Sequence, residues 1–512
     1  MISLFNFFSD FHQKFSFRVF MSFTEELSRI VGAENVLQEE HKLSYLVDKH
    51  HRLIGNAISV VKPKSTEEVA AIVRLCNKHK ITITPQGGNT GFVGAAIPDD
   101  SENNIVLSLE RMNSIRAIDL ENDTITVDAG CLLHEVHEQA SEHQRLFPLS
   151  FGAEKHCSIG GNLATNAGGS KVIRYGSARE LTLGLEVVTA EGEIWSNLKG
   201  LRKDNSGYDL RDLYIGSEGT LGVITAAVLK LYPVPQAQKL AFLLFDTIKN
   251  AVTFLADIKP KLGAGLTAYE LISANNLELV RKNRLVDELP FSDPKNEANW
   301  YVLLEFSDHE NERHADDLIK TVIDAGINAG IVKSALVAKN KQQTKLFWRI
   351  RNIEISKAHQ ISERYLVRHD ISLPVSQITQ FLAITEQKLR KAYPHTASLI
   401  YGHLADGNLH YDVALRFSTT DAEFKIEQAR ITKIVHDGVR SLGGSICAEY
   451  GVGQIKVDQL LFYKTQIELD LMRRLKRAFD PQGIFNPGKI IPVNNLSDDK
   501  NLQIVKALGA TS

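Results

Sequence analysis

The sequence has few cysteines and no long apolar run, and these shortages exclude several classes of protein. Its 512 residues contain four cysteines, and no two of them form a CxxC pair. This excludes a secreted disulfide scaffold and indicates a reducing compartment. No apolar stretch reaches the roughly 18 residues that a transmembrane helix needs. The 59 basic and 61 acidic residues give a net charge of -2, without the basic surplus of a general nucleic-acid binder.

Length and composition are typical of a soluble protein with several domains. At roughly 100–200 residues per domain, 512 residues correspond to two to four domains. Hydrophobic residues make up 43% of the chain, so a large core forms without disulfides. Glycine outnumbers proline by 34 to 14, with no collagen or linker pattern. Such a surplus indicates backbone that must approach another molecule closely.

The first 23 residues differ from the rest of the chain. Eight of the 23 phenylalanines lie there, whereas Lys14 and Arg18 are the only basic residues of this segment. A signal peptide needs a charged start and a continuous apolar core, and this segment has neither. We favour an upstream start codon, with Met21 as the true first residue. An organelle transit peptide or a membrane-surface anchor is the alternative.

The first half of the chain predicts a glycine-rich α/β domain that ends near residue 235. Ser65 and Glu68 form a capping box, and apolar residues at helical spacing follow them. A short strand over residues 81–84 leads directly into a glycine loop. The further predicted elements are strands over 105–109, 124–128, 181–190 and 220–231 and a helix over 131–143.

Beyond residue 235 glycine becomes rarer and a second fold begins. Two strand–helix units predict a ferredoxin-like layer, with helices on one face of an antiparallel sheet. Glycine motifs return after about residue 442, before a long helix over 464–479. The other predicted elements are strands at 240–245, 300–306 and within 398–413, and helices at 247–258 and 314–325.

Three glycine loops in the first domain indicate a long ligand. Consecutive glycines leave backbone N–H groups uncovered, which forms a nest for an anion such as pyrophosphate, although each loop alone also fits a tight turn. Residues 263–268 formally fit the dinucleotide fingerprint, but they follow a helix, so we interpret them as a chance match. The three loops cover residues 87–94, 160–169 and 216–222.

Two histidines and a glutamate predict a metal site. His403 and His410 flank a six-residue loop, and Glu449 could supply an oxygen ligand. Two His and one carboxylate with open positions form a catalytic rather than a structural set. On spacing alone, a structural role for the histidines is the favoured alternative, because the chain contains 17 of them and the spacing does not match standard zinc motifs.

Arginines near the middle of the chain offer a carboxylate site. Arg349, Arg351 and Arg368 carry the guanidinium fork that binds carboxylates with two hydrogen bonds. Surface arginines on a helix explain the same spacing equally well, so these residues alone do not define a substrate.

These motifs together resemble a known family, the FAD-dependent D-2-hydroxyacid dehydrogenases, such as D-lactate and D-2-hydroxyglutarate dehydrogenases. Their FAD domain is of the p-cresol methylhydroxylase or vanillyl-alcohol oxidase type. The resemblance covers residues from about 40 to 492, and the run LRKDNSGYDL looks closest to the D-2-hydroxyglutarate branch. The matching runs are PQGGNTGFVGA, GAEKHCSIGGNLATNAGG, LRKDNSGYDLRDLYIGSEGTLGVIT, GHLADGNLH, AEYGVG and FNPGKI.

The resemblance implies an α+β fold with an inserted cap. The FAD-binding domain of two α/β subdomains would span residues 24–235 and the ferredoxin-like substrate domain 236–440, and the segment 441–495 would return to the FAD domain. Residues 1–23 and 496–512 would form an extension and a tail. FAD would bind without a covalent link, because Asn89 and Thr90 stand where covalent members carry a His. The implied FAD-binding residues are Pro85, Gly87, Gly88, Asn89, Thr90, Gly91, Gly94, Gly160, Gly161, Asn162, Thr165, Asn166, Gly168, Gly169, Glu218, Thr220, Gly222, Ile224 and Asn486.

The resemblance also implies the residues of the reaction. His403, His410 and Glu449 match the ligands of a divalent metal, zinc or manganese, and Arg351 matches the arginine that binds the substrate carboxylate. Oxidation of an α-hydroxy acid needs a hydride acceptor, which the flavin supplies, and a base that takes the hydroxyl proton. A metal on the hydroxyl lowers its pKa.

Departures from the family pattern concern the catalytic residues. Tyr450 stands where the family has its general-base His. Ile355 and Arg368 align with the Thr and Lys that bind a distal carboxylate. Arg368 could still bind a carboxylate, but Ile355 cannot donate a hydrogen bond, which argues against a five-carbon diacid. His369 stands where the family often has Tyr, so we hypothesise that the two residues have exchanged places and that His369 is the base. The alternatives are Tyr450 as a phenolate, with its pKa of about 10 lowered by the metal and Arg, and a purely structural His369.

The predicted function is oxidation of a D-2-hydroxy acid to the 2-oxo acid, with electrons passed to a separate acceptor. This acceptor would be a quinone, an electron-transferring flavoprotein or a cytochrome. We expect a homodimer in the cytoplasm, with the mitochondrion or peripheral association with the inner membrane face as the alternative, and no nucleic-acid partner. The alternative functions are an FAD-binding oxidase, an ether-lipid synthase and a non-catalytic subunit of a glycolate-oxidase-like complex. The intact metal-ligand set disfavours the last two.

Overall fold

The computed structural model describes residues 23–49, 51–287, 289–291, 299–362, 365–415 and 420–492. The Phe-rich segment up to residue 22 and the predicted tail 496–512 lie outside these ranges. Phe23, at the end of that segment, is fully buried in the core. No helix in the described ranges has both the length and the apolar character that crossing a bilayer requires.

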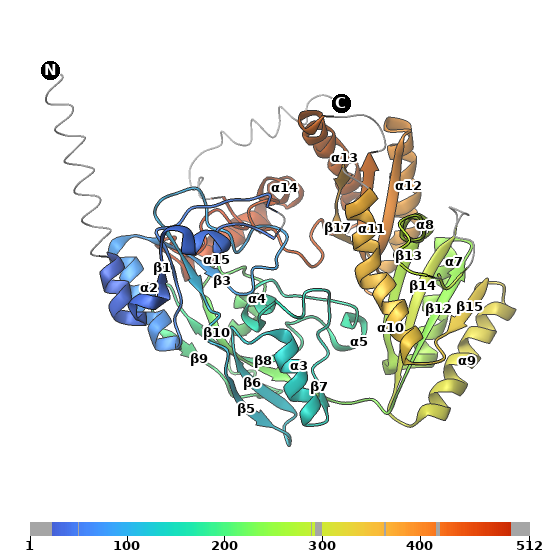
Figure 1. Ribbon diagram of the computed structural model, residues 1–512, viewed down its shortest axis with the longest axis horizontal. Helices are drawn as coiled ribbons and strands as arrows, with labels where there is room; N and C mark the ends of the chain where they lie inside the picture. Colours follow the sequence, from blue (N-terminus) through green and yellow to red (C-terminus); the bar gives the residue numbers. More distant parts are fainter. Residues whose placement is uncertain are drawn as a thin grey trace.

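A four-stranded sheet begins the glycine-rich domain (Figure 1). In sheet order its strands are β1 (Val36–Leu37), β2 (Ser59–Val61), β4 (Asn104–Ser108) and β3 (Thr82–Gln86), of which the last three are parallel. The helix α2 (Thr66–His79) links β2 to β3. It begins where the sequence predicts, because the Ser65 side chain accepts a hydrogen bond from the Glu68 backbone N–H.

An antiparallel five-stranded sheet completes this domain and shares a hydrophobic core with the first sheet. In sheet order its strands are β5 (Ile115–Asp119), β6 (Thr124–Asp128), β10 (Val223–Lys230), β8 (Thr182–Val188) and β9 (Ile194–Ser196). The associated elements are α3 (Leu133–Glu142), α4 (Ile159–Ala164), α5 (Val172–Tyr175), α6 (Leu210–Tyr214) and the ribbon of β7 (Arg145–Leu146) and β11 (Tyr232–Pro233). The predicted strands and helix of this region are confirmed, with ends shifted by a few residues.

A larger antiparallel sheet of eight strands forms the cap, which lies beside the glycine-rich domain (Figure 1). In sheet order its strands are β15 (Ser334–Val337), β12 (Ala237–Phe245), β14 (Trp300–Asp308), β13 (Leu266–Ser273), β18 (Thr396–His403), β19 (Asn408–Leu415) and β16 (Leu366–Val367). The last strand, β17 (Asp370–Ser372), also pairs with β19.

The cap has helices on both faces of its sheet, whereas the sequence predicted them on one face only. The prediction missed the second layer because its helices, over residues 274–282, 341–349 and 355–362, are too short for a clear helical periodicity. One face packs against α7 (Ile248–Leu262), α9 (Glu312–Asn328), α12 (Ile378–Ala392) and α13 (Asp421–Ser441). The other packs against α8 (Ala274–Lys282), α10 (Lys341–Arg349), the π-helical turn η4 (Ile350–Glu354) and α11 (Ile355–Ser362).

The C-terminal segment leaves the cap and packs on the glycine-rich domain (Figure 1). It contains α14 (Val457–Tyr463) and α15 (Gln466–Phe479). Phe485 forms a bridge with Ile83 of β3. The buried Glu218 carboxylate accepts hydrogen bonds from the backbone N–H groups of Val452 (2.8 Å) and Gly453 (2.7 Å). Two segments that are distant in sequence therefore build the glycine-rich domain together.

Candidate active site

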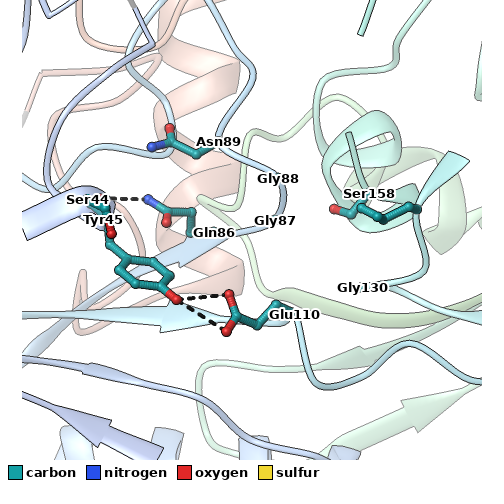
Figure 2. Close-up of a pocket in the computed structure, with 10 residues that line it drawn as sticks. Ser44, Tyr45, Gln86, Gly87, Gly88, Asn89, Glu110, Gly130 and Ser158 are labelled. Atoms are coloured by element: carbon teal, nitrogen blue, oxygen red, sulfur yellow. Dashed lines mark hydrogen bonds between the residues drawn. The ribbon is translucent and has the colours of Figure 1, made fainter. Parts of the chain in front are cut away.

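The predicted glycine loops line two cavities of the glycine-rich domain. The larger has a volume of about 310 Å³ and lies between the loop at 86–89 and Ser158 (Figure 2). At one side of it the Tyr45 hydroxyl donates to the Glu110 carboxylate at 3.0 Å. The smaller cavity, of about 80 Å³, also borders Gln86 and Gly87, so both cavities adjoin the same loop.

At some positions of these loops, close approach of another group leaves no room for a side chain. A Cβ on Gly87 would lie 2.1 Å from Ser158 Oγ, and a Cβ on Gly88 would lie 1.8 Å from the carbonyl oxygen of His156. A Cβ on Gly161 would meet only Ser158 Oγ, at 3.3 Å, so this glycine opens onto the smaller cavity. Uncovered backbone along two adjoining cavities fits a long phosphate-containing ligand such as FAD.

About half of the predicted FAD-binding residues line the two cavities. Two of the others hold the loops: Asn166 Oδ1 accepts a hydrogen bond from Ser177 Oγ (2.8 Å), and Asn486 Nδ2 donates to the carbonyls of Ala95 (2.8 Å) and Glu218 (2.7 Å). The lining residues among the predicted set are Pro85, Gly87, Gly88, Asn89, Gly160, Gly161, Thr165, Glu218, Gly222 and Ile224.

The three predicted metal ligands come together as one cluster, the His–His–Glu cluster of His403, His410 and Glu449. One ligand atom from each residue lies within 4.8 Å of the others. His403 Nε2 is 3.8 Å from Glu449 Oε2, and His410 Nε2 is 3.5 Å from Glu449 Oε1. A Cβ on Gly168 would lie 3.9 Å from Glu449 Oε2, so the loop 160–169 reaches this cluster. The donor set fits a divalent cation with open coordination positions.

Strand alternation explains this convergence. Glu270 of β13 pairs with His403 of β18, and Tyr401 of β18 pairs with His410 of β19. Because side chains alternate along a strand, these four residues share one face of the cap sheet. Their neighbours Leu404 and Leu409 point to the opposite face, where they join the core with α12 and α13.

Two buried carboxylates contact residues of the cluster and fix their positions. Glu270 Oε1 lies 2.7 Å from His403 Nδ1. Asp370 Oδ2 accepts hydrogen bonds from the backbone N–H groups of Glu449 (2.9 Å) and Tyr450 (3.0 Å). Sequence reasoning did not assign either carboxylate. Glu270 carried no motif, whereas Asp370 follows the noted pair Arg368 and His369.

Burial and neighbouring charge set the protonation of the cluster. Burial lowers the pKa of His403, but the Glu270 carboxylate outweighs this effect and raises the pKa to about 9. Burial lowers the pKa of His410 to about 4. Burial also raises the pKa of Glu449 to about 7, although His403 opposes this shift. At neutral pH His410 is therefore an unprotonated imidazole that offers a lone pair.

Arg351 is the predicted arginine that the structure brings to the cluster. It lies in the π-helical turn η4, with 6% of its side chain exposed, and its Nη2 is 2.7 Å from Glu270 Oε2. The guanidinium stacks 5.1 Å from the centre of the Tyr401 ring. Its Nε has no hydrogen-bond partner among the described residues, so a donor is left for a ligand.

The other two predicted arginines have different surroundings. Arg349 Nε donates to Glu354 Oε1 at 2.7 Å, and Arg368 is exposed. Ile355, aligned with the family's Thr, is fully buried in the apolar layer under α11. The π-helical turn before it contains one more residue than an α-helical turn would.

The structure does not bring His369 to the cluster. His369 precedes β17 and points to the opposite face of the sheet from Arg368 and Asp370. Its Nδ1 lies 2.7 Å from the Tyr411 carbonyl oxygen and its Nε2 lies 3.2 Å from Thr432 Oγ1. Both ring nitrogens are thus engaged away from the cluster, and this geometry supports a structural role rather than the general base.

Tyr450 does lie at the cluster. Its ring stacks on the His410 ring with centroids 5.7 Å apart and contacts the Phe92 ring at 4.6 Å. Burial and the Glu449 charge raise the pKa of Tyr450 well above its ordinary value. Within the protein's own charges, this shift favours the neutral phenol of Tyr450 over the phenolate.

Comparison with known proteins assigns the family. Residues 57–196 match the FAD binding domain model, and residues 234–490 match the model of the C-terminal domain of FAD linked oxidases. The mitochondrial D-2-hydroxyglutarate dehydrogenase of Bos taurus is 35% identical over 468 residues, which cover 91% of this chain and 83% of the relative. The chain belongs to the FAD-dependent D-2-hydroxyacid dehydrogenases. It is therefore an FAD-dependent enzyme.

Other relatives agree with this assignment. A D-2-hydroxyglutarate–pyruvate transhydrogenase of Saccharomyces cerevisiae is 34% identical over 459 residues, which cover 88% of this chain and 90% of the relative. A D-2-hydroxyglutarate dehydrogenase of Xanthomonas citri is 35% identical over 448 residues, which cover 88% of this chain and 92% of the relative.

Solved structures with the same fold confirm the predicted fold class. p-Cresol methylhydroxylase superposes with a TM-score of 0.74 at 19% identity, covering 93% of this chain and 98% of its own. Alkyldihydroxyacetonephosphate synthase gives a TM-score of 0.70 at 20% identity, covering 91% of this chain and 85% of its own. At these identities the likeness concerns the fold alone.

Proposed function

We propose that this dehydrogenase oxidises a D-2-hydroxy acid to the 2-oxo acid. One observation carries the proposal: the His–His–Glu cluster, Arg351 and the loop 160–169 meet at one place. An α-hydroxy acid needs a cation for its carboxylate and an electrophile for its hydroxyl next to the hydride acceptor. This arrangement offers both functions on rigid strands.

Two bound groups would complete the site. FAD, held without a covalent link by the loops at 85–94, 160–169 and 218–224, supplies the hydride acceptor when bound. A divalent metal, zinc or manganese, held by His403, His410 and Glu449, would supply a Lewis acid that lowers the pKa of the substrate hydroxyl.

The chain's own residues bind and orient the substrate. The unused Nε–H of Arg351 is available to donate to the substrate carboxylate. The Tyr401 ring under the guanidinium restricts the orientation of this donor. Tyr450, whose ring stacks on the His410 ring and whose pKa is raised, would donate a hydrogen bond to the substrate. The proton of the metal-polarised hydroxyl would then pass to water at the site.

The substrate side chain distinguishes members of this family. The relatives' names specify D-2-hydroxyglutarate. The buried Ile355 offers no hydrogen bond to a distal carboxylate, and Arg368 is the remaining cation at the aligned positions. We therefore include D-lactate beside D-2-hydroxyglutarate as a candidate. The cytoplasmic location, the homodimer and a separate quinone, flavoprotein or cytochrome acceptor stay predictions.

Anaerobic flavin reduction tests the proposed function. The FAD-loaded enzyme is mixed with a panel of D- and L-2-hydroxy acids, with and without a chelator. We expect bleaching of the flavin absorbance by at least one D-acid and loss of that bleaching after metal removal. If no D-acid reduces the flavin, the proposed reaction is wrong. If reduction continues after complete metal removal, the metal has no part in it.

A further inference from the structure

We propose that Glu270 is a positioning residue that couples the His–His–Glu cluster to the substrate-binding arginine, an inference that rests on the proposed function. Glu270 lies in the middle of β13, and its side chain is 1% exposed. Each carboxylate oxygen contacts a different partner: Oε1 lies 2.7 Å from His403 Nδ1, and Oε2 lies 2.7 Å from Arg351 Nη2. One side chain therefore connects the metal ligand to the carboxylate donor.

The contact with His403 fixes which ring nitrogen faces the metal. Because a carboxylate oxygen accepts, Nδ1 of His403 carries the proton. The lone pair of the neutral ring then resides on Nε2, the atom that faces Glu449 at 3.8 Å. A carboxylate behind a metal-bound histidine also increases the basicity of the ring, and loss of such a partner typically weakens metal binding about 10–100-fold.

The contact with Arg351 fixes the position of the guanidinium. The arginine extends from a π-helical turn, and the Tyr401 ring covers one face of its guanidinium. The ion pair with Glu270 supplies a second fixed point, while Nε stays without a hydrogen-bond partner among the described residues. The donor is thus held in place before the substrate arrives.

Both contacts come from one residue of a strand in the middle of the cap sheet, which holds the Glu270 carboxylate in a fixed place. β13 pairs with β14 on one side and β18 on the other.

A matched control stands on the neighbouring strand. Glu305 of β14 is similarly buried and accepts from Thr267 Oγ1 (2.8 Å) and Trp348 Nε1 (3.2 Å), without contact with His403 or Arg351.

Two measurements on FAD-loaded Glu270→Gln and Glu305→Gln test the coupling. The first is the zinc dissociation constant without substrate, from competition with a chelating dye. The second is the KM for the D-2-hydroxy acid at saturating zinc. We expect Glu270→Gln to weaken zinc binding about 10–100-fold and to raise KM about tenfold even with zinc saturated. Glu305→Gln should change neither value by more than about twofold.

Either measurement can overturn the proposal. Unchanged zinc affinity in Glu270→Gln would remove the role at His403, and a wild-type KM at saturating zinc would remove the role at Arg351. If Glu270→Gln does not fold, Glu270→Asp replaces it, since the shorter side chain cannot reach both partners and should impair at least one measurement. An Asp variant with both values unchanged would also refute the coupling.

The test also separates this proposal from the proposed function. Zinc binding needs no substrate, so it decides the His403 contact even if no D-2-hydroxy acid reduces the wild-type flavin. In that case the Arg351 contact is decided by binding of oxalate, a carboxylate probe, followed by the change in flavin absorbance. Weaker oxalate binding in Glu270→Gln supports the coupling, and equal binding contradicts it.

Discussion

Replacement of His369 by glutamine should make the enzyme less sensitive to acid while leaving flavin reduction intact. His369 is buried between the Tyr411 carbonyl and Thr432, and burial lowers its pKa to about 4. In the unfolded chain the pKa returns to about 6.5. Between these values the unfolded state binds the proton more strongly, so stability is lost as the pH falls below 6.5.

The size of this effect follows from the two pKa values. Between pH 7 and pH 5, a shift from about 6.5 to about 4 removes about 2 kcal/mol of the free energy of unfolding. His369→Gln removes this proton linkage. From pH 7 to pH 5 the wild type should therefore lose about 2 kcal/mol more of its free energy of unfolding than the variant does. Urea unfolding at both pH values measures this difference.

A matched control and a kinetic measurement complete this test. His395 is exposed, so His395→Gln should leave the pH dependence of unfolding as it is in the wild type. A stability difference for His369→Gln that is equal at pH 7 and pH 5 would refute the burial argument. A large loss of flavin reduction would instead restore His369 as the general base.

Three further substitutions test the site. Arg351→Lys should raise KM about 10–100-fold with unchanged FAD content in steady-state assays, because one charge-assisted hydrogen bond is lost; an unchanged KM would contradict its carboxylate role. His410→Asn should lower bound metal, measured by elemental analysis, and slow flavin reduction more than about 100-fold, with a normal flavin spectrum; full metal content would count against it as a ligand. Gly161→Val should fold, as judged by circular dichroism, but purify with little FAD, since its side chain would enter the smaller cavity; full FAD content would remove this loop from the cofactor site.

The sequence predicts the glycine-rich domain well because its signals are local. A glycine loop follows a strand directly, and the close approach of the His156 backbone to Gly88 leaves no room for a side chain there. The convergence of His403, His410 and Glu449 was also predictable, although only the family resemblance, not the spacing, joined Glu449 to the two histidines.

Contacts across the cap sheet could not be predicted from the sequence. Glu270 lies 133 residues before His403 and is a lone carboxylate in an apolar strand, without any local motif. The place of His369 was not predictable, because adjacent strand residues point to opposite faces and no local signal told which neighbour of Asp370 faces the cluster. The second helical layer was missed because each of its helices is only eight or nine residues long, too short for a clear apolar periodicity.

The hydrogen bonds of Glu218 have a consequence for biosynthesis. This carboxylate holds a backbone segment that lies 234 residues later in the chain. At about 5–20 residues per second, the ribosome needs roughly 10–50 seconds to make that intervening length. During this interval the nascent glycine-rich domain has the strands of its first sheet but not the C-terminal segment that packs on it. We therefore expect stable flavin loading only after the C-terminal segment has been translated.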